Sequence, residues 1–362
     1  MENKIVVAIR ADSSTEFGSG HIMRCLTLSE QLVSSGAEVF FICAELAGNM
    51  ISLIEKKGYV VESIPWCTEE KQDHMWEKDL EYTKKIIIRL KKQIDWLIVD
   101  HYGLDNRWEN GLRAYTRRVM VIDDLANRQH DCDLLLDQNL YMDIRTRYDG
   151  LLPAHCLTLL GPQYVLLRQE FYETRKKVKV RDGIVKRIVV FFGGSDSTNE
   201  TTKALQAIQL LNKKEIYVDV IVGNINPHKE QIKKLCNVMP NTTFYCQINN
   251  MAEIMASADL AIGAGGATTW ERCYLGLPSL VIVVAENQRK VTEAVADNGA
   301  IINLGYGSNL SVESLCKALQ ELFASSRQIQ LMSRKALDLV DNNAFSGDKL
   351  VIQNMLTVHS VC

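Results

Sequence analysis

A histidine that follows two glycines is the first candidate for chemistry in this chain. The segment reads Gly18-Ser19-Gly20-His21; an apolar run over residues 5–9 precedes it, and apolar residues at helical spacing follow it from Ile22 to Val33. Glycines at a strand-to-helix turn allow the backbone to approach a ligand, and the N–H groups at the start of a helix favour anions such as phosphate. We expect Gly20 to lie beside a bound diphosphate, and His21, neutral at the helix N-terminus, to accept a proton there.

The spacing of these glycines differs from that in dinucleotide-binding proteins. The fingerprint G-x-G-x-x-G requires a third glycine, but Met23 stands in that place, and no acidic residue ends the next apolar run at Cys43. Nicotinamide and flavin are therefore disfavoured, and we expect no cofactor. A lone histidine often has only a structural role, and this alternative stays open for His21.

Two further glycine-rich segments lie in the second half of the chain. In Gly193-Gly194-Ser195-Asp196, Gly194 and Ser195 are expected to donate to a diphosphate, although a glycine pair is common in any such turn. The segment Gly263-Ala-Gly-Gly-Ala-Thr-Thr-Trp-Glu271 leads into a helix, so the amides around Gly266 are expected to hold phosphate.

Polar residues follow this second glycine-rich segment. Functionally, Glu271 is expected to accept hydrogen bonds from both ribose hydroxyls, with Thr268 near the phosphates and Asn287-Gln288 further along the chain. Structurally, Thr268-x-x-Glu271 has the spacing of a capping box, which would explain the glutamate without any ligand.

Further polar residues are expected near the ligand. Asp12 follows the first apolar run, and Asp100-His101-Tyr102-Gly103 ends the fourth, as is common for strands that face a site. An aspartate that caps the next helix is an equally good explanation of Asp100. Arg168 precedes a basic segment and could either reach the ligand or form an ion pair at a hinge.

Composition excludes several classes of protein. A net charge of -3 argues against a nucleic-acid binder, and no apolar run approaches the roughly 18 residues of a membrane span. The ten cysteines form no C-x-x-C pair, so reduced thiols and a cytoplasmic location are expected. No metal site is expected either, because the neighbouring Asp123 and Asp124 would point in opposite directions from a strand end.

The elements that must position these residues alternate between strand and helix. Apolar runs at 5–9, 39–42, 60–64, 96–99, 119–122 and 134–136, with a second series at 188–192, 216–222, 260–262 and 280–284, predict two α/β domains with doubly wound, Rossmann-like parallel sheets. We expect a first domain over 1–172, a solvated linker over 173–187, a second domain over 188–345 and a closing helix over 346–362. Such domains bind ligands at the carboxyl ends of their strands, so we expect the site in a cleft between them.

Taken together, these motifs resemble nucleotide-sugar glycosyltransferases of the GT-B fold, especially the MurG type. A narrower resemblance, over nearly the whole chain, is to the PseG family of UDP-2,4-diacetamido-2,4,6-trideoxy-β-L-altropyranose hydrolases of pseudaminic acid biosynthesis. The residues that carry it are Arg10-x-Asp12-Ser13, Gly18-x-Gly20-His21-x-x-Arg24-Cys25-Leu26, Asp100-His101-Tyr102-Gly103, Asp123-Asp124, Leu166-Leu167-Arg168-x-Glu170-Phe171-Tyr172 and Thr269-Trp270-Glu271-Arg272-Cys273.

The resemblance implies hydrolysis of a UDP-sugar to UDP and the free sugar without a metal. His21 matches the family's catalytic histidine, Tyr102 a residue of the sugar pocket, Glu271 the ribose contact and Asn287 a sugar or phosphate contact. We expect a monomer that binds a UDP-sugar and neither nucleic acid nor membrane. The alternative is a MurG-like glycosyltransferase, for which the basic and apolar segment 84–92 could serve a lipid acceptor, although ordinary helix amphipathicity also explains it. A protein that binds the nucleotide sugar without turnover is a third possibility.

Overall fold

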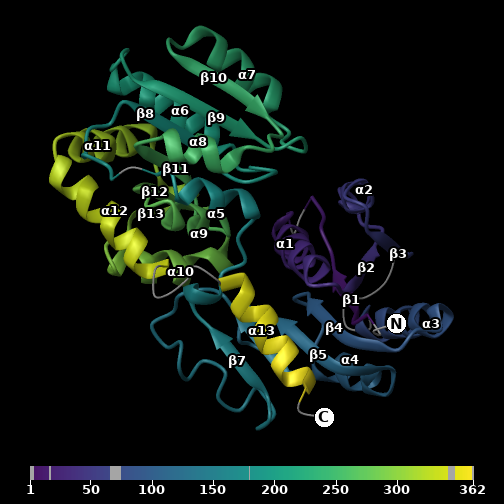
Figure 1. The fold of residues 1–362 in the computed structure, drawn as a ribbon. Coiled ribbons are helices and arrows are strands. Elements are labelled where there is room, and N and C mark those ends of the chain that lie inside the picture. The colour runs from purple at the N-terminus through teal and green to yellow at the C-terminus, as the bar shows by residue number, and fades with distance from the viewer. Residues whose placement is uncertain (1–3, 16–17, 66–74, 179, 341–346, 361–362) are drawn as a thin grey trace. The chain divides into compact units, whose positions relative to one another are not determined.

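The computed structural model describes residues 4–15, 18–65, 75–178, 180–340 and 347–360. The chain divides into two compact units, each built around one parallel sheet (Figure 1). The first unit comprises Met1–Asn139, Asp143–Leu166 and Ser346–Cys362, and the second comprises Leu140–Met142 and Leu167–Phe345.

The sheet of the first unit has seven strands in the order β3-β2-β1-β4-β5-β6-β7. The strands are β1 (Val6–Ala11), β2 (Glu38–Ala44), β3 (Val60–Ile64), β4 (Ile94–Asp100), β5 (Thr116–Ile122), β6 (Leu134–Asp137) and β7 (Leu157–Leu160). Every residue of β4 is buried, which explains its continuous apolar run. Because β1 and β4 are parallel neighbours, Ala11 lies opposite Asp100 where both strands end.

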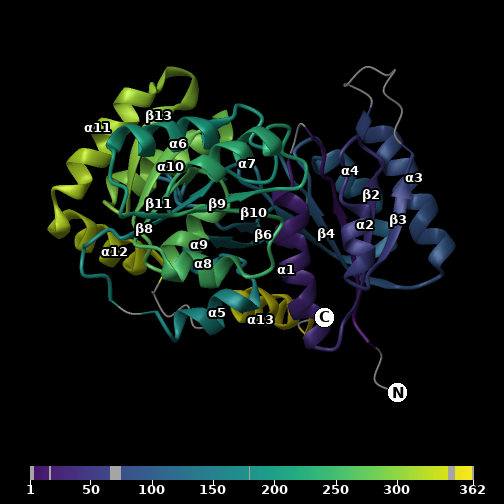
Figure 2. The ribbon, with the colours of Figure 1, turned by 90° about the horizontal axis from the view of Figure 1, so that it is seen from above.

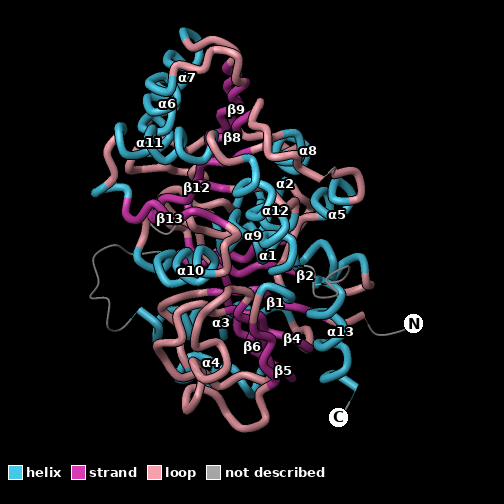
Figure 3. Tube along the Cα trace, turned by 90° about the vertical axis from the view of Figure 1, so that its left-hand side faces the viewer, coloured by secondary structure: helices cyan, strands magenta, loops and turns pink. Residues whose placement is uncertain are grey.

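Helices cover both faces of this sheet, as Figure 3 shows for β1, β4 and β5. On one face, α1 (Gly20–Ser34) and α2 (Ile51–Lys56) contribute to a hydrophobic cluster with the strands. On the other face, α3 (Met75–Leu90) and α4 (Asn106–Leu112) pack, and the short helices η2 (Arg113–Tyr115) and η3 (Pro162–Tyr164) complete the unit. The last helix, α13 (Gly347–Ser360), packs against α1 (Figure 2).

The sheet of the second unit has six strands in the order β10-β9-β8-β11-β12-β13. The strands are β8 (Arg187–Phe191), β9 (Tyr217–Val222), β10 (Thr242–Cys246), β11 (Leu260–Ala264), β12 (Ser279–Val283) and β13 (Ile301–Tyr306). The helices are α5 (Gln169–Arg175), α6 (Glu200–Leu211), α7 (Lys229–Val238), α8 (Met251–Ser257), α9 (Thr268–Tyr274), α10 (Glu286–Asp297), η4 (Gly307–Asn309), α11 (Val312–Phe323) and α12 (Ser326–Val340).

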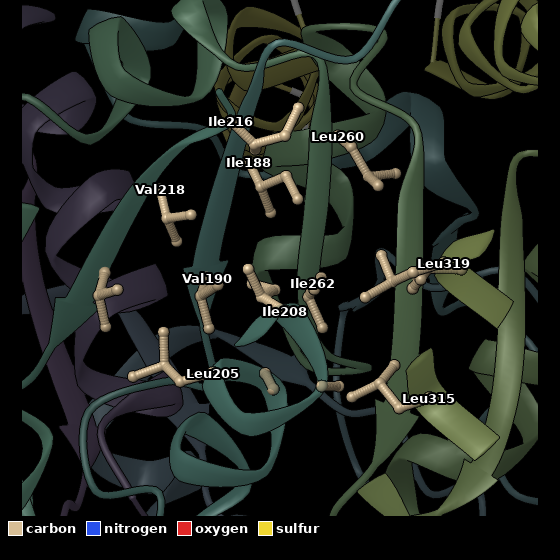
Figure 4. Packing of buried hydrophobic residues seen from close by; sticks show 14 of the residues in the cluster. Ile188, Val190, Leu205, Ile208, Ile216, Val218, Leu260, Ile262, Leu315 and Leu319 are labelled. Atoms are coloured by element: carbon tan, nitrogen blue, oxygen red, sulfur yellow. The ribbon is translucent and has the colours of Figure 1, made fainter. Parts of the chain in front are cut away.

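Aliphatic side chains from strands and helices form the core of this unit. Ile188 and Val190 of β8 and Ile262 of β11 pack against Leu205 of α6 and Leu315 of α11, as Figure 4 shows. All five are almost completely buried. Burial of such side chains stabilises the fold by about 1.5–3 kcal/mol each, so this cluster holds β8 and β11 firmly beneath the glycine-rich loops that follow them.

The predicted fold class, two α/β domains with doubly wound parallel sheets, is confirmed. The boundaries differ from the expected ones. Leu167–Phe345 belongs to the second unit, which thus includes α5, packed on α8 and α9. The expected solvated linker is partly buried: Arg181 donates to the carbonyl oxygens of Leu275 (2.6 Å) and Gly276 (2.8 Å). Among the helices in the described parts of the chain, none is long and apolar enough to cross a bilayer.

Candidate active site

His21 is the second residue of α1 and contacts the carboxylate that ends β4. Its Nδ1 lies 2.5 Å from Oδ1 of Asp100. Since a carboxylate can only accept, Nδ1 of the neutral ring carries the proton, and the lone pair is on Nε2. Nε2 has no hydrogen-bond partner among the residues that the structure describes. His21 is largely buried, with 8% of its surface exposed. The contact with Asp100 therefore gives His21 the tautomer that a general base requires.

Arg24, one turn further along α1, binds the same carboxylate. Its Nε donates to Oδ2 of Asp100 and its Nη2 to Oδ1, both at 2.6 Å. Burial alone would raise the pKa of Asp100, but the charge of Arg24 and the contact with His21 outweigh it and hold that pKa well below its usual range. Asp100 is therefore a permanent acceptor that orients His21. A third donor of Arg24, Nη1, reaches Oδ2 of Asp124 at 3.0 Å.

Two other predicted residues lie at the same corner of the first unit. The ring of Tyr102 meets that of His21 edge to face, with the centroids 4.5 Å apart. Gly20 begins α1, and Gly18 has a φ of +75°, a conformation that favours glycine. A Cβ at Gly20 would have no heavy atom within 4 Å, so the backbone has open space there.

Asp12 is occupied by protein groups. Its carboxylate binds Nη1 and Nη2 of the buried Arg10 at 2.6 and 2.7 Å and accepts from the backbone N–H of Ala44 at 2.7 Å. It also lies 3.3 Å from Nε2 of His101. These contacts join β1 to β2 and orient His101, and none of them links Asp12 to His21. A substrate contact of Asp12 stays a prediction.

The glycine-rich loop of the second unit is organised by a buried arginine that sequence reasoning noted within a motif but gave no role. Arg272 donates from Nη2 to the carbonyl oxygen of Ala264 (2.8 Å) and to Oγ1 of Thr269 (3.0 Å), and from Nη1 to Oγ1 of Thr268 (3.2 Å). Burial lowers the pKa of Arg272 to about 10, so it stays charged at neutral pH.

The glycines of this loop allow close packing. A Cβ at Gly263 would lie 2.4 Å from the carbonyl oxygen of Phe191, and one at Gly265 would lie 2.1 Å from Oγ1 of Thr292. Gly266 lies near Gln288, because its Cβ position is 3.6 Å from Nε2 of that side chain. Gln288 is in the first turn of α10, next to Asn287, and accepts from the N–H of Val284 (3.2 Å).

The capping box suggested by the spacing does not form. Ala267 is the N-cap of α9 without a side-chain hydrogen bond, and the Thr268 hydroxyl accepts from Arg272 instead. Glu271 accepts at Oε1 from Nη2 (2.9 Å) and Nε (3.3 Å) of Arg168. Its Oε2 is buried and has no hydrogen-bond partner within the described residues. Arg168 therefore forms an ion pair, but inside the second unit and not at a hinge, and its contact with the ligand stays a prediction.

The other predicted phosphate segment follows β8. Gly193 has a φ of +91°, and Gly223 must be a glycine because a Cβ there would lie 2.1 Å from the carbonyl oxygen of Gly194. Asp196 accepts from the N–H groups of Glu200 and Thr201 at the start of α6. Because β8 and β11 are adjacent parallel strands, both glycine segments emerge at the same end of one sheet.

Two further expectations concern an acceptor surface at segment 84–92 and the binding of a metal ion. In segment 84–92, Ile86 and Ile87 are buried in the core beneath α3, which favours ordinary amphipathicity over an acceptor surface. Over the described ranges, no cluster of three or more His, Cys, Asp or Glu side chains is arranged to hold a metal ion.

The chain is similar in sequence to one family model and to several known proteins. Residues 188–350 match the family model described as the glycosyltransferase family 28 C-terminal domain. A UDP-2,4-diacetamido-2,4,6-trideoxy-β-L-altropyranose hydrolase of Campylobacter jejuni is 26% identical over 83% of this chain and 99% of its own. The spore coat polysaccharide biosynthesis protein SpsG of Bacillus subtilis is 24% identical over 96% of this chain and 98% of its own. An uncharacterised protein of Methanocaldococcus jannaschii is 26% identical over 78% of this chain, which spans only 57% of that protein.

Among solved structures, MurG of Acinetobacter baumannii matches with a TM-score of 0.67 over 98% of this chain and 100% of its own. The identity is 16%, so this likeness concerns the fold. The predicted resemblance is thus confirmed: along most of its length the chain resembles a PseG-type hydrolase, and its residues 188–350 match the model of the glycosyltransferase family 28 C-terminal domain.

Proposed function

We propose that this protein is a nucleotide-sugar hydrolase that converts UDP-2,4-diacetamido-2,4,6-trideoxy-β-L-altropyranose and water to UDP and the free sugar. The observation that carries the proposal is the His21–Asp100 pair, in which the carboxylate holds Nδ1–H and leaves Nε2 as the acceptor. The similarity to the Campylobacter hydrolase over nearly its full length supports the choice of substrate.

In the proposed reaction, Nε2 of His21 removes a proton from water as the water oxygen attacks the anomeric carbon. The bond between that carbon and the diphosphate oxygen breaks, its electron pair leaves with UDP, and the configuration inverts. Asp100 stabilises the positive charge that develops on the ring. Because a diphosphate is a good leaving group, positioning and stabilisation of its charge supply the rest of the catalysis.

The nucleotide is assigned to the second unit. Backbone amides at Gly194 and Gly266, with Ser195, Thr268 and the pair Asn287-Gln288, are proposed to bind the diphosphate and the sugar, and Glu271 the ribose. Two observations support this assignment: Gln288 lies close to Gly266, and Oε2 of Glu271 receives no hydrogen bond from any residue that the structure describes.

A UDP-sugar glycosyltransferase is the second candidate, favoured by the match of residues 188–350 to a glycosyltransferase domain. A transferase would use the same histidine to deprotonate an acceptor alcohol. It would release little free sugar from the donor in water alone, whereas the hydrolase needs no acceptor.

The test is incubation of the purified protein with a panel of UDP-sugars, followed by measurement of free UDP and free sugar. We expect stoichiometric release of both from the diacetamido substrate without added metal, with ¹⁸O from labelled water in the sugar. His21→Ala should lower kcat about 10²–10⁴-fold, whereas His155→Ala, which removes an exposed histidine of the same unit, should not change it. Binding of UDP without any turnover would contradict the proposal, as would full activity of His21→Ala.

A further inference from the structure

We propose that Arg168 is a positioning residue for Glu271: it holds one oxygen of that carboxylate so that the other is presented to the ribose of the nucleotide. The inference rests on the proposed function, in which Glu271 binds the ribose. In this role Arg168 affects the ligand through Glu271 and not through a direct contact of its own.

The two oxygens of Glu271 have different surroundings. Oε1 accepts two hydrogen bonds from the guanidinium of Arg168, at 2.9 and 3.3 Å. Oε2 is buried, and no donor reaches it from any described residue. A buried carboxylate oxygen without a donor is unfavourable, and a hydroxyl group is the kind of donor that would satisfy it. Oε2 is thus left for a ligand.

Arg168 is itself held in place from several sides. Its Nη1 pairs with Oε1 of Glu170 at 2.6 Å, and its guanidinium lies 5.0 Å from the centre of the buried Phe171 ring. Glu170 in turn accepts from the N–H of Ala252 at the start of α8 (3.2 Å). The guanidinium therefore has a defined position before any ligand arrives, which lowers the entropic cost of ordering Glu271.

The helix that carries Glu271 does not orient this side chain by itself. The capping box is absent, and the hydroxyls of Thr268 and Thr269 accept from Arg272. Within the described part of the chain, Arg168 is the only hydrogen-bond donor to the Glu271 side chain. Removal of Arg168 should therefore free the carboxylate to rotate and leave the rest of the glycine-rich loop intact.

The experiment compares the affinity for UDP with that for 2′,3′-dideoxy-UDP, which lacks both ribose hydroxyls, by calorimetry. The wild-type protein should prefer UDP by about 10- to 100-fold, as expected for hydrogen bonds to a charged group. Arg168→Ala should reduce this preference to about threefold or less, and Arg168→Lys should give an intermediate value because lysine lacks the planar pair of donors.

A matched control variant and a double variant distinguish the loss of Glu271 positioning from a general loss of order around α5 and α9. Arg175 lies on the same helix α5 and contacts α9 through the Tyr274 ring, 5.7 Å from its guanidinium, without reaching Glu271. Arg175→Ala should keep the wild-type preference. In a Glu271→Ala background, Arg168→Ala should change the preference no further, since the two residues act as one unit.

Three outcomes would overturn the inference. Full preference for UDP in Arg168→Ala would show that Glu271 needs no positioning. Equal binding of the two nucleotides by the wild-type protein would show that Glu271 does not contact the ribose, while the proposed hydrolase could still bind UDP through its phosphates. No binding of UDP at all would remove the proposed function together with the inference.

Discussion

Asp137, the last residue of β6, is the side chain whose replacement should most clearly change how folding stability depends on pH. It is 1% exposed, and its Oδ2 lies 3.0 Å from the hydroxyl of Tyr148. The same hydroxyl lies 3.0 Å from Oδ2 of Asp123. A hydroxyl has one proton and can donate to only one of two carboxylates. The other carboxyl must carry a proton of its own.

The surroundings identify Asp137 as the protonated partner. Asp123 also binds Arg128 and the N–H of Ala126, both at 2.8 Å, as an ionised carboxylate would. For Asp137, burial, reinforced by the charge of Asp124, outweighs the neighbouring Arg147 and raises the pKa to about 7. Below about pH 7, Asp137 therefore holds a proton that it can donate to the Tyr148 oxygen while Tyr148 donates to Asp123.

The sign and size of the effect follow from this pKa. An unfolded aspartate titrates near about 3.9, so between that value and about 7 the folded protein holds a proton that the unfolded chain has lost. The stabilisation is complete below the unfolded pKa and disappears as the pH rises through the folded one. Linkage gives a loss of about 2.5 kcal/mol between pH 5 and pH 8. Asp137→Asn cannot ionise, yet it can still donate to Tyr148 and accept from the N–H of Asn139.

The assay is urea denaturation of both proteins at pH 5, 6, 7 and 8. The stability of the wild-type protein relative to Asp137→Asn should fall steadily over this range, by about 2.5 kcal/mol in all. Asp149→Asn, which removes an exposed carboxyl beside Tyr148, controls for the loss of one negative charge. A difference between wild-type and Asp137→Asn that is the same at every pH would refute the assignment of the proton to Asp137.

Three further predictions concern the two candidate sites. Asp100→Asn should lower kcat about 10²–10⁴-fold, because the amide can present its NH2 group to Nδ1 of His21 and so favour the other tautomer, and should lower Tm because the buried Arg24 loses its charged partner; an unchanged kcat would argue against the pair. Glu271→Ala should raise KM for the UDP-sugar with little change in kcat, and an unchanged KM would exclude the ribose contact. Arg272→Met should destabilise the second unit by about 2–4 kcal/mol, measured by denaturation, since Ala264 and the two threonine hydroxyls lose their donor; an unchanged midpoint would contradict that structural role.

The sequence predicted the strands that are buried on both faces and missed most of those at the edges. β4 and β11 are wholly buried, so their apolar runs are unbroken. β7, β10 and β13 lie at sheet edges and were not predicted. In β10, Thr243 and Cys246 are exposed, and in β7, Leu157 and Thr158 are exposed, so neither segment shows a long apolar run. Where only one side of a short strand needs to be apolar, composition carries little signal.

Sequence reasoning named the residues of the candidate site but did not predict which of them contact one another. His21 and Asp100 were both singled out, yet 79 positions separate them, and only the order of the strands brings them together. Arg24 was noted within a motif, without its role of holding Asp100. Sequence reasoning did not identify the partners of Asp12 and Arg168, which pair with Arg10 and Glu271, because a buried or half-buried charge is stable only beside an opposite charge. Their contacts with the ligand stay predictions.

Strand order explains why these particular residues meet, and it does so in the same way in both units. In the first unit β1 and β4 are neighbours, and the chain leaves β1 toward β2 on one side and returns through β4 to β5 on the other. Loops that follow two such strands diverge at the end of the sheet and leave room for a ligand between them. His21 follows β1 and Asp100 ends β4. In the second unit β8 and β11 are the corresponding neighbours, followed by Gly193–Ser195 and by the loop that leads to Glu271. In a sequence predicted to form a doubly wound sheet, polar residues and glycines that follow the first and fourth strands are therefore expected to lie close together. For this chain, that rule predicts the proximity of His21 and Asp100 from the sequence alone.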